Sequence, residues 1–118
     1  MQFKPVNNTI SGIEKGDFYC YEIKSSVEDF NSKNGHNQIG NHNYYVMPQE
    51  AFDKVKDKIP FRVGVYVKPY DTAKQTLVSV KKAKRTDRTK SALEMLLMMF
   101  RSANRQIYKE NEKCINLK

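Results

Sequence analysis

Phe18-Tyr-Cys-Tyr-Glu22-Ile-Lys24 is the stretch of sequence that decides the fold. Aromatic and β-forming side chains dominate it, which predicts a β-strand over residues 18–24. Residues 1–6 predict a shorter strand before it, and a polar segment containing glycine, residues 7–16, separates the two. Two strands joined in this way pair antiparallel, so the chain is expected to begin with a hairpin that has a long polar loop.

Helical and strand patterns alternate after this hairpin. A short helix is expected over residues 26–30, with Ser25 or Ser26 as its N-cap, and the polar stretch 31–43 is expected to be a loop. The later elements are a strand over 44–47 that stops at Pro48, a helix over 49–58, strands over 61–67 and 76–82, and a helix over 89–112 with a capping box at Ser91 and Glu94. The connection from 24 to 44 is long enough for a right-handed crossover to a parallel strand. This order predicts an α/β domain with a mixed β-sheet flanked by helices and with a long C-terminal helix.

Length and composition set the class of protein. The 118 residues are enough for one domain spanning 1–118, and the 39% hydrophobic content argues against disorder. No apolar run reaches the roughly 18 residues that a membrane span needs, and residues 1–6 do not resemble a secretory signal. Cys20 and Cys114 are therefore expected to be free thiols in a reducing compartment, which suggests a cytoplasmic location.

The positive charge indicates the kind of partner. A net charge of +8 favours a polyanion such as DNA, RNA or an anionic surface, although a basic protein without such a partner is the alternative. Residues 81–90 hold six basic side chains and one acidic one. The candidate phosphate contacts are Lys81, Lys82, Lys84, Arg85, Arg88 and Lys90. A helix N-terminus near Thr89 would assist them, and a merely solvated strand end is the competing interpretation.

Glu22 and Lys24 are the candidate catalytic residues. Residues two apart in a strand point to the same face, about 6.5 Å apart. The Glu22 carboxylate, with the backbone carbonyl of Ile23, could hold Mg²⁺ or Mn²⁺, and Lys24 could orient a metal-bound water or stabilise developing charge. This combination suits phosphodiester hydrolysis, but Glu-x-Lys also occurs in ordinary surface ion pairs.

The sequence around this motif resembles a known family. The matching series is Phe18–Phe30, Tyr44–Pro48, Ile59–Pro60 and Gly64–Val67, with weaker similarity in Lys81–Arg85. It is similar to the MmcB-like branch of the PD-(D/E)xK nuclease superfamily, which includes relatives in phage and mobile elements. The resemblance implies a restriction-endonuclease-like fold, DNA as substrate, Glu22 as metal ligand and Lys24 as catalytic lysine.

One departure from that family matters for activity. The superfamily needs a second acidic residue on the first strand of the hairpin. The expected register places Phe18 near Pro5, Cys20 near Phe3 and Glu22 near Met1. The aspartate would then lie at or just before Met1, where no acidic residue stands, and neither Asp17 nor Glu14 can reach the position. The helix that usually precedes this strand is also absent, so the chain is either a truncated or late-started form of a longer protein or a natural variant that lost the ligand, and weak or no cleavage is expected of it.

Three residues of the polar loop are weaker candidates. Gln38 could assist the site, as a glutamine or basic residue does in some superfamily members. His36 and His42 could bind metal, but without a third ligand they are more typical of plain loop residues. Tyrosines 19, 21, 44 and 45 are more typical of sheet packing than of a stacking platform.

The C-terminal helix predicts a further contact. Its expected apolar face consists of Ala92, Leu93, Leu96, Leu97, Phe100, Ala103 and Ile107. The apolar run 95–100 is wider than one helix face, which suggests a homodimer or a protein partner in addition to the core. Three functions therefore compete: a DNA nuclease or its relic, a non-catalytic nucleic-acid binder, and an anti-defence or regulatory interaction protein of a mobile element.

Overall fold

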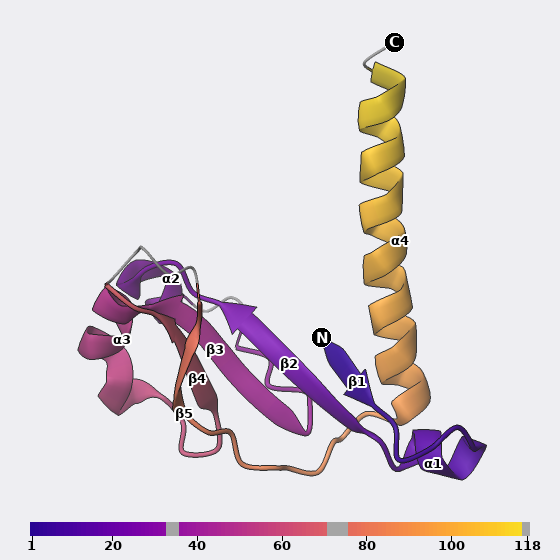
Figure 1. Cartoon of the computed structure of the whole chain (residues 1–118), viewed down its shortest axis with the longest axis horizontal. Coiled ribbons are helices and arrows are strands. Elements are labelled where there is room, and N and C mark those ends of the chain that lie inside the picture. The colour runs from indigo at the N-terminus through magenta and orange to yellow at the C-terminus, as the bar shows by residue number, and fades with distance from the viewer. Residues whose placement is uncertain (33–35, 71–75, 117–118) are drawn as a thin grey trace. The chain divides into compact units, whose positions relative to one another are not determined.

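The computed structural model describes residues 1–32, 36–70 and 76–116, with side chains in the last helix described for residues 92–105 and 107. Contacts divide the chain into two compact units. The first contains residues 1–4 and 17–89, and the second contains residues 5–16 and 90–118. Each unit is described by itself, and the element labels are those of Figure 1.

A five-stranded mixed sheet forms the first unit among the described residues. Its strands, which are adjacent in chain order, are β1 (Gln2–Lys4), β2 (Asp17–Ile23), β3 (His42–Pro48), β4 (Gly64–Lys68) and β5 (Val78–Lys81). The β2–β3 and β3–β4 pairs are parallel, and the two outer pairs are antiparallel. The parallel β2–β3 pair confirms the predicted crossover and the mixed α/β class.

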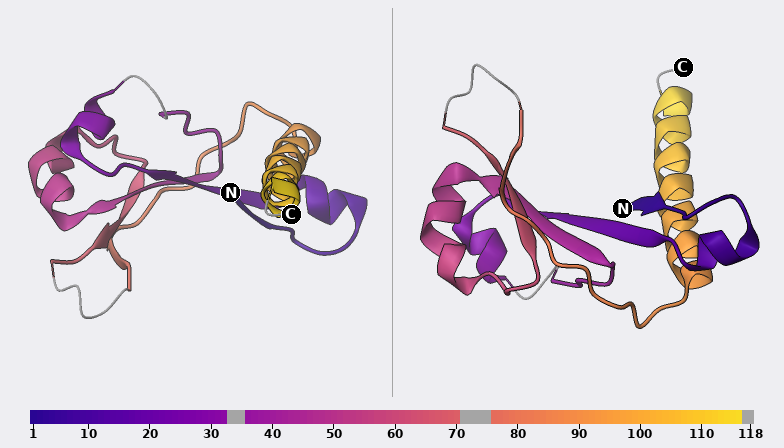
Figure 2. Two further views of the ribbon diagram at one scale, coloured as in Figure 1. Left: turned by 90° about the horizontal axis from the view of Figure 1, so that it is seen from above. Right: turned by 60° about the horizontal axis from the view of Figure 1, so that its bottom comes forward.

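Helices α2 (Val27–Asn31) and α3 (Gln49–Val55), the latter extended by the 3-10 turn η1 (Lys56–Lys58), lie beside each other on one face of this sheet (Figure 2). The predicted cap of α2 is confirmed, because the Ser26 hydroxyl accepts a hydrogen bond from the Asp29 N–H at 3.1 Å. The Asp29 carboxylate in turn accepts the Ser25 N–H at 3.0 Å. These reciprocal bonds satisfy backbone groups that a helix start leaves without partners.

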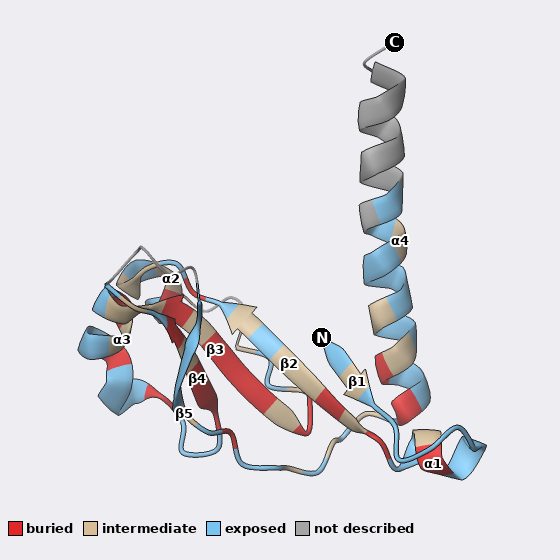
Figure 3. Cartoon of the chain, viewed as in Figure 1, coloured by how far each residue is buried: buried red, intermediate tan, exposed pale blue. Residues whose placement is uncertain are grey.

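The core lies between these helices and the strands β3 and β4 (Figure 3). Alternate residues of each strand point into it, and each fully buried large apolar side chain contributes on the order of 1.5–3 kcal/mol. The buried cluster consists of Phe30, Tyr45, Met47, Ala51, Val55, Ile59, Val63, Val65 and Val67. The opposite face of the sheet carries ring contacts, with Tyr44 stacked on Tyr21 at 5.5 Å and tilted against Tyr66 at 4.9 Å between centroids.

The predicted strand over 61–67 is wrong at its start. Its N-terminal residues form a turn, in which the Val63 N–H bonds to the Pro60 carbonyl at 3.1 Å, and β4 begins only at Gly64. A Cβ atom at Gly64 would lie 2.4 Å from the Tyr44 ring and 2.5 Å from the Ala83 nitrogen, so a side chain does not fit there. The loop 69–75, expected between β4 and β5, lies partly outside the described residues.

The second unit contains α1 (Ile10–Glu14) and α4 (Ala92–Asn116). Helix α1 corrects the expectation of a plain loop over 7–16: the Thr9 hydroxyl caps it by accepting the Gly12 N–H at 3.0 Å. The predicted cap of α4 is confirmed, since the Ser91 hydroxyl accepts the Glu94 N–H at 3.1 Å. No helix within the described part of the chain is long and apolar enough to cross a membrane.

The predicted apolar face of α4 is only partly the buried one. Ala92 and Met95 are buried, but Leu93 is 77% exposed and Phe100 is 63% exposed. Met95, which the prediction left outside this face, is fully buried. The apolar residues of α4 cover more of the helix circumference than one packing surface can bury, so part of them stays exposed.

Candidate nucleic-acid interface and the Glu22 site

Glu22 lies in strand β2 and Lys24 directly follows the last residue of that strand, Ile23, with both side chains on the side opposite to Ile23. The residue between them, Ile23, is 76% exposed on the other face, whereas Lys24 is buried. The Lys24 N–H donates to the Val46 carbonyl at 2.9 Å, which continues the β2–β3 ladder beyond the end of β2. Strand β2 is interior, but β3 and not β2 is the middle strand of the sheet.

The carboxylate of Glu22 holds the loop that follows α2. Its Oε1 accepts the Asn37 N–H at 2.7 Å and lies 3.4 Å from the Gln38 nitrogen, which is at the limit of a hydrogen bond. Gln38 has a left-handed backbone with φ of 42°. The Oε2 atom is buried and has no hydrogen-bond partner among the described residues. Glu22 therefore acts as an anchor for this loop.

His36 and Gln38 meet at the hydroxyl of Tyr45. The Gln38 amide donates to that hydroxyl at 3.2 Å. Nε2 of His36 lies 2.9 and 3.0 Å from the carbonyl oxygens of Phe30 and Ser32, which only accept, so Nε2 carries a hydrogen. In the neutral ring Nδ1 then accepts from the Tyr45 hydroxyl at 2.6 Å. Burial raises the pKa of the Tyr45 phenol, which keeps its proton available for this network. The side chains of His36 and Gln38 thus connect the loop to the core.

The hairpin register differs from the prediction by two residues. Phe3 pairs with Phe18 and Gln2 with Tyr19, whereas Phe18 was expected near Pro5. Lys4 pairs with Asp17, so the connection between the two strands consists of residues 5–16 and begins earlier than predicted. The pairing toward Glu22 ends at Gln2 and Tyr19. Glu22 therefore lies beyond the paired part of β1 and not opposite Met1, as the predicted register had placed it.

The residues present do not form a ligand set for Mg²⁺ or Mn²⁺. Such ions need about six oxygen ligands, and Glu22 supplies one carboxylate whose Oε1 already accepts a backbone N–H. Within the described ranges, no three His, Cys, Asp or Glu side chains converge. His42 pairs with Asp17 at 2.9 Å, toward the start of β2 and away from Glu22. No metal-dependent step is therefore derived for this chain.

Half of the predicted basic cluster has partners within the fold. The Arg85 guanidinium makes a two-point contact with the Asp17 carboxylate at 2.9–3.1 Å, and its hydrogen bonds hold the pKa of Asp17 below the ordinary value. Arg88 lies 4.9 Å above the Phe18 ring and donates to Asn41. Lys90 lies 3.9 Å from Glu94, and α4 begins at Ala92 and not at 89. These three cations have structural roles that compete with phosphate binding.

The other three predicted cations, Lys81, Lys82 and Lys84, belong to a segment that lies beside the turn at residues 60–63, which was not predicted from the sequence. The Lys84 N–H donates to the Arg62 carbonyl at 3.0 Å, and the Lys81 ammonium donates to the Pro60 carbonyl at 2.9 Å. The Lys84 ammonium lies 4.3 Å from the centroid of the Phe61 ring. The side chains of Arg62, Lys82 and Lys84 are exposed. We refer to Phe61, Arg62, Lys81, Lys82 and Lys84 as the basic surface.

A hollow of about 290 Å³ lies at the carboxyl ends of β2 and β3. Ligands of open α/β sheets often bind at such a place. Its lining residues are Ser25, Ser26, Val27, Glu28, Pro48, Glu50, Ala51 and Lys54. Two carboxylates and one ammonium do not favour a phosphate, and neither Glu22 nor Lys24 lines the hollow. The basic surface is therefore the better candidate for an anionic ligand.

Comparisons of this chain with protein-family models, curated proteins and solved structures found no match. Function is accordingly inferred from the geometry of the site.

Proposed function

We propose that this chain is a nucleic-acid-binding protein that contacts phosphates through the basic surface. One observation carries the proposal: the backbone hydrogen bond from Lys84 to Arg62 holds two segments that are distant in sequence side by side, and the side chains of Arg62, Lys82 and Lys84 in these segments are exposed. A surplus of cations at one place attracts the phosphate backbone of DNA or RNA. DNA is the partner that the family resemblance favours.

We also propose that the chain is related to the PD-(D/E)xK nucleases and has weak or no hydrolytic activity. The Glu-x-Lys strand, the short helix and the parallel strand follow one another in the expected order. On this proposal Glu22 has exchanged metal binding for holding the loop at Asn37. Lys24 alone cannot offset the charge of a phosphoryl transition state.

Binding of a fluorescent oligonucleotide, followed by anisotropy at low salt, tests the first proposal. The variant Arg62→Gln with Lys84→Gln should bind more weakly than the parent chain. The matched control is Lys4→Gln with Lys68→Gln, which removes the same charge from exposed positions on β1 and β4. Equal loss in both variants would mean that net charge and not the basic surface governs binding, and no binding by the parent chain would reject the function.

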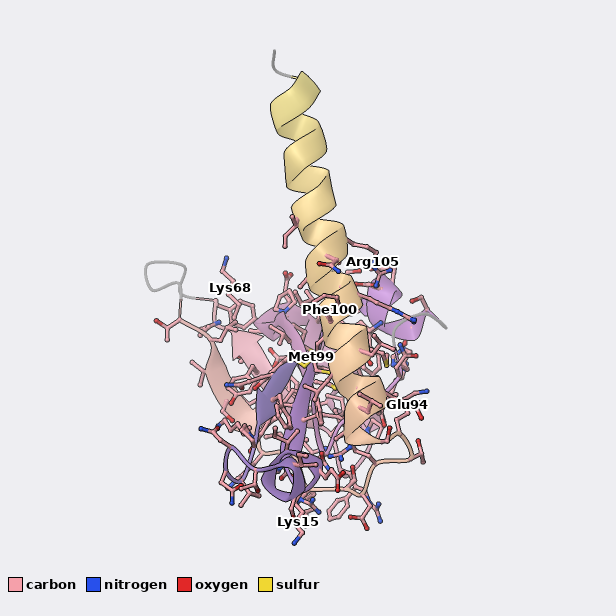
Figure 4. The ribbon with its side chains drawn as sticks, turned by 90° about the vertical axis from the view of Figure 1, so that its right-hand side faces the viewer. Lys15, Lys68, Glu94, Met99, Phe100 and Arg105 are labelled. Atoms are coloured by element: carbon pink, nitrogen blue, oxygen red, sulfur yellow. The ribbon has the colours of Figure 1, made fainter. Side chains whose placement is uncertain are left out.

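A second function, self-association through α4, is favoured by a separate observation. Leu93, Leu97, Phe100 and Ile107 are 77%, 44%, 63% and 53% exposed. Together with Asn104 they follow the alternating spacing of four and three residues that forms a coiled-coil seam. Phe100 is labelled on α4 in Figure 4. The occupant of this face would be α4 of a second copy, with Asn104 setting the register.

Sedimentation equilibrium separates this function from the first. A dimer that dissociates on Leu97→Asp, while Glu94→Asp leaves it intact, would support self-association. A monomer at all concentrations would reject it, and a partner protein of a mobile element would then be the remaining interaction hypothesis.

A further inference from the structure

Phe61 belongs to the basic surface and is not part of the buried core cluster. Its side chain is 71% exposed, whereas Val63, two residues later, is 2% exposed. Phe61 occupies the turn before β4. The hydrogen bond from the Val63 N–H to the Pro60 carbonyl closes this turn, and the buried strand β4 follows it directly. The ring contributes little to the core, and most of its surface remains accessible to a ligand.

The cations around Phe61 specify the kind of ligand. The Lys84 ammonium lies 4.3 Å from the ring centroid, and Lys84 is tied through its backbone N–H to Arg62 at 3.0 Å. An aromatic ring beside positive charges matches a nucleotide, which has a flat base and an anionic phosphate one sugar apart. Protein surfaces that bind single-stranded nucleic acid combine these two features.

We propose that Phe61 is a base-stacking residue for single-stranded nucleic acid, with Arg62 and Lys84 contacting the adjoining phosphates. This inference rests on the proposed function and adds the strand preference to it. In a duplex each base is already stacked on its neighbours, so Phe61 has no base to contact there. An unpaired base can stack on the ring, and the chain should therefore bind single strands more tightly than duplexes.

The absence of tryptophan from the chain allows a direct test. Phe61→Trp introduces a sole tryptophan, whose fluorescence should be quenched when a base of an unlabelled oligothymidylate stacks on it. Ile10→Trp is the control, since Ile10 is 79% exposed and lies on α1, outside both proposed interfaces. Quenching at position 61 but not at position 10 is expected, and no quenching at position 61 while the oligonucleotide is bound would overturn the inference.

Affinity measurements complete the test. Phe61→Ala and Phe61→Leu should each weaken binding to the single strand by about 5- to 150-fold, the loss that one base–aromatic stack produces, and leave duplex binding unchanged. Phe61→Tyr should retain most of the affinity because the flat ring remains. Oligouridylate beside oligothymidylate separates RNA from DNA as the source of the base. Full affinity of Phe61→Ala for the single strand would overturn stacking and leave the proposed function standing, whereas a parent chain that binds neither form at low salt would reject both.

Discussion

Neutralising three exposed cations of the basic surface should change the salt dependence of nucleic-acid binding by a calculable amount. The perturbation is a triple variant, Arg62→Gln, Lys82→Gln and Lys84→Gln. With Lys81, these residues make four cations that the fold leaves available to phosphate, because Arg85 is held by Asp17, Arg88 lies against Phe18, and Lys90 is near Glu94.

The number of phosphate contacts sets the slope of log affinity against log salt. Each contact contributes about −0.9 for duplex DNA and about −0.7 for a single strand, so four contacts give about −3.6 and about −2.8. Raising the salt from about 50 to about 200 mM should then weaken binding roughly 150-fold for the duplex and roughly 50-fold for the single strand. Six contacts, as predicted from the sequence alone, would give about −5 for the duplex.

Fluorescence anisotropy titrations at several salt concentrations provide the assay. The triple variant should retain a slope of only about −1, the value for one contact. The control triple variant of Lys4, Lys15 and Lys68 to glutamine removes the same charge from other exposed positions and should keep the parent slope. A parent slope near −5 would show that the paired arginines and Lys90 take part, and an unchanged slope in the first variant would refute the assignment of the surface.

Three further perturbations address the interior of the first unit. Glu22→Gln should leave nucleic-acid binding unchanged, because Oε1 can still accept the Asn37 N–H. In a plasmid-nicking assay with Mg²⁺ or Mn²⁺, the parent chain should cleave no more than this variant. Strong cleavage by the parent chain alone would mean that Glu22 is catalytic. Arg85→Gln should make the stability of the fold less dependent on pH in acid. Arg85 is the main cause of the lowered Asp17 pKa, so the stabilisation from this ion pair is present above the ordinary Asp pKa and is lost as the pH falls through the lowered pKa of the folded state. Thermal melts over the acid range would detect the difference, and a variant with the parent's pH dependence would contradict it. Tyr45→Phe should lower the free energy of unfolding by about 1–3 kcal/mol, because His36 and Gln38 lose the hydroxyl that they share. The control Tyr21→Phe, at an exposed position, should change the free energy of unfolding by less than about 0.5 kcal/mol. Denaturant titration measures both, and equal effects of the two substitutions would contradict the network.

The sequence predicted those features that depend on local pattern and chain length. Residues 18–24 predicted β2, because β-forming and aromatic side chains are concentrated there. Ser26 predicted the start of α2, and the long segment before residue 42 predicted a parallel neighbour for β2. These predictions succeed because a strand pattern and a helix cap depend on residues that are close together in the chain, and a crossover to a parallel strand depends only on the length of the connecting segment.

Features that depend on distant partners could not be predicted in this way. The contact of Arg85 with Asp17 joins residues 68 positions apart, and nothing in the basic run of 81–90 distinguishes Arg85 from Lys82. The hairpin register, in which Lys4 pairs with Asp17, also differs by two residues from the one expected from the strand and loop lengths. The turn that exposes Phe61 was also hidden, because Phe-Arg-Val-Gly-Val-Tyr-Val is a β-forming run throughout.

A catalytic motif in sequence becomes a catalytic site only when its partners converge in space, and Glu22 illustrates the difference. The Glu-x-Lys spacing correctly places Glu22 and Lys24 on one face, yet one Glu22 oxygen accepts a loop N–H and the other is buried. A metal ion would need both oxygens accessible and a second carboxylate opposite, where strand β1 has no residue paired with Glu22. The basic surface has the complementary property, since its residues come from the turn before β4 and from residues 81–84, which the Lys84–Arg62 hydrogen bond holds side by side. We therefore propose that binding depends on this surface and that Glu22 has a structural role.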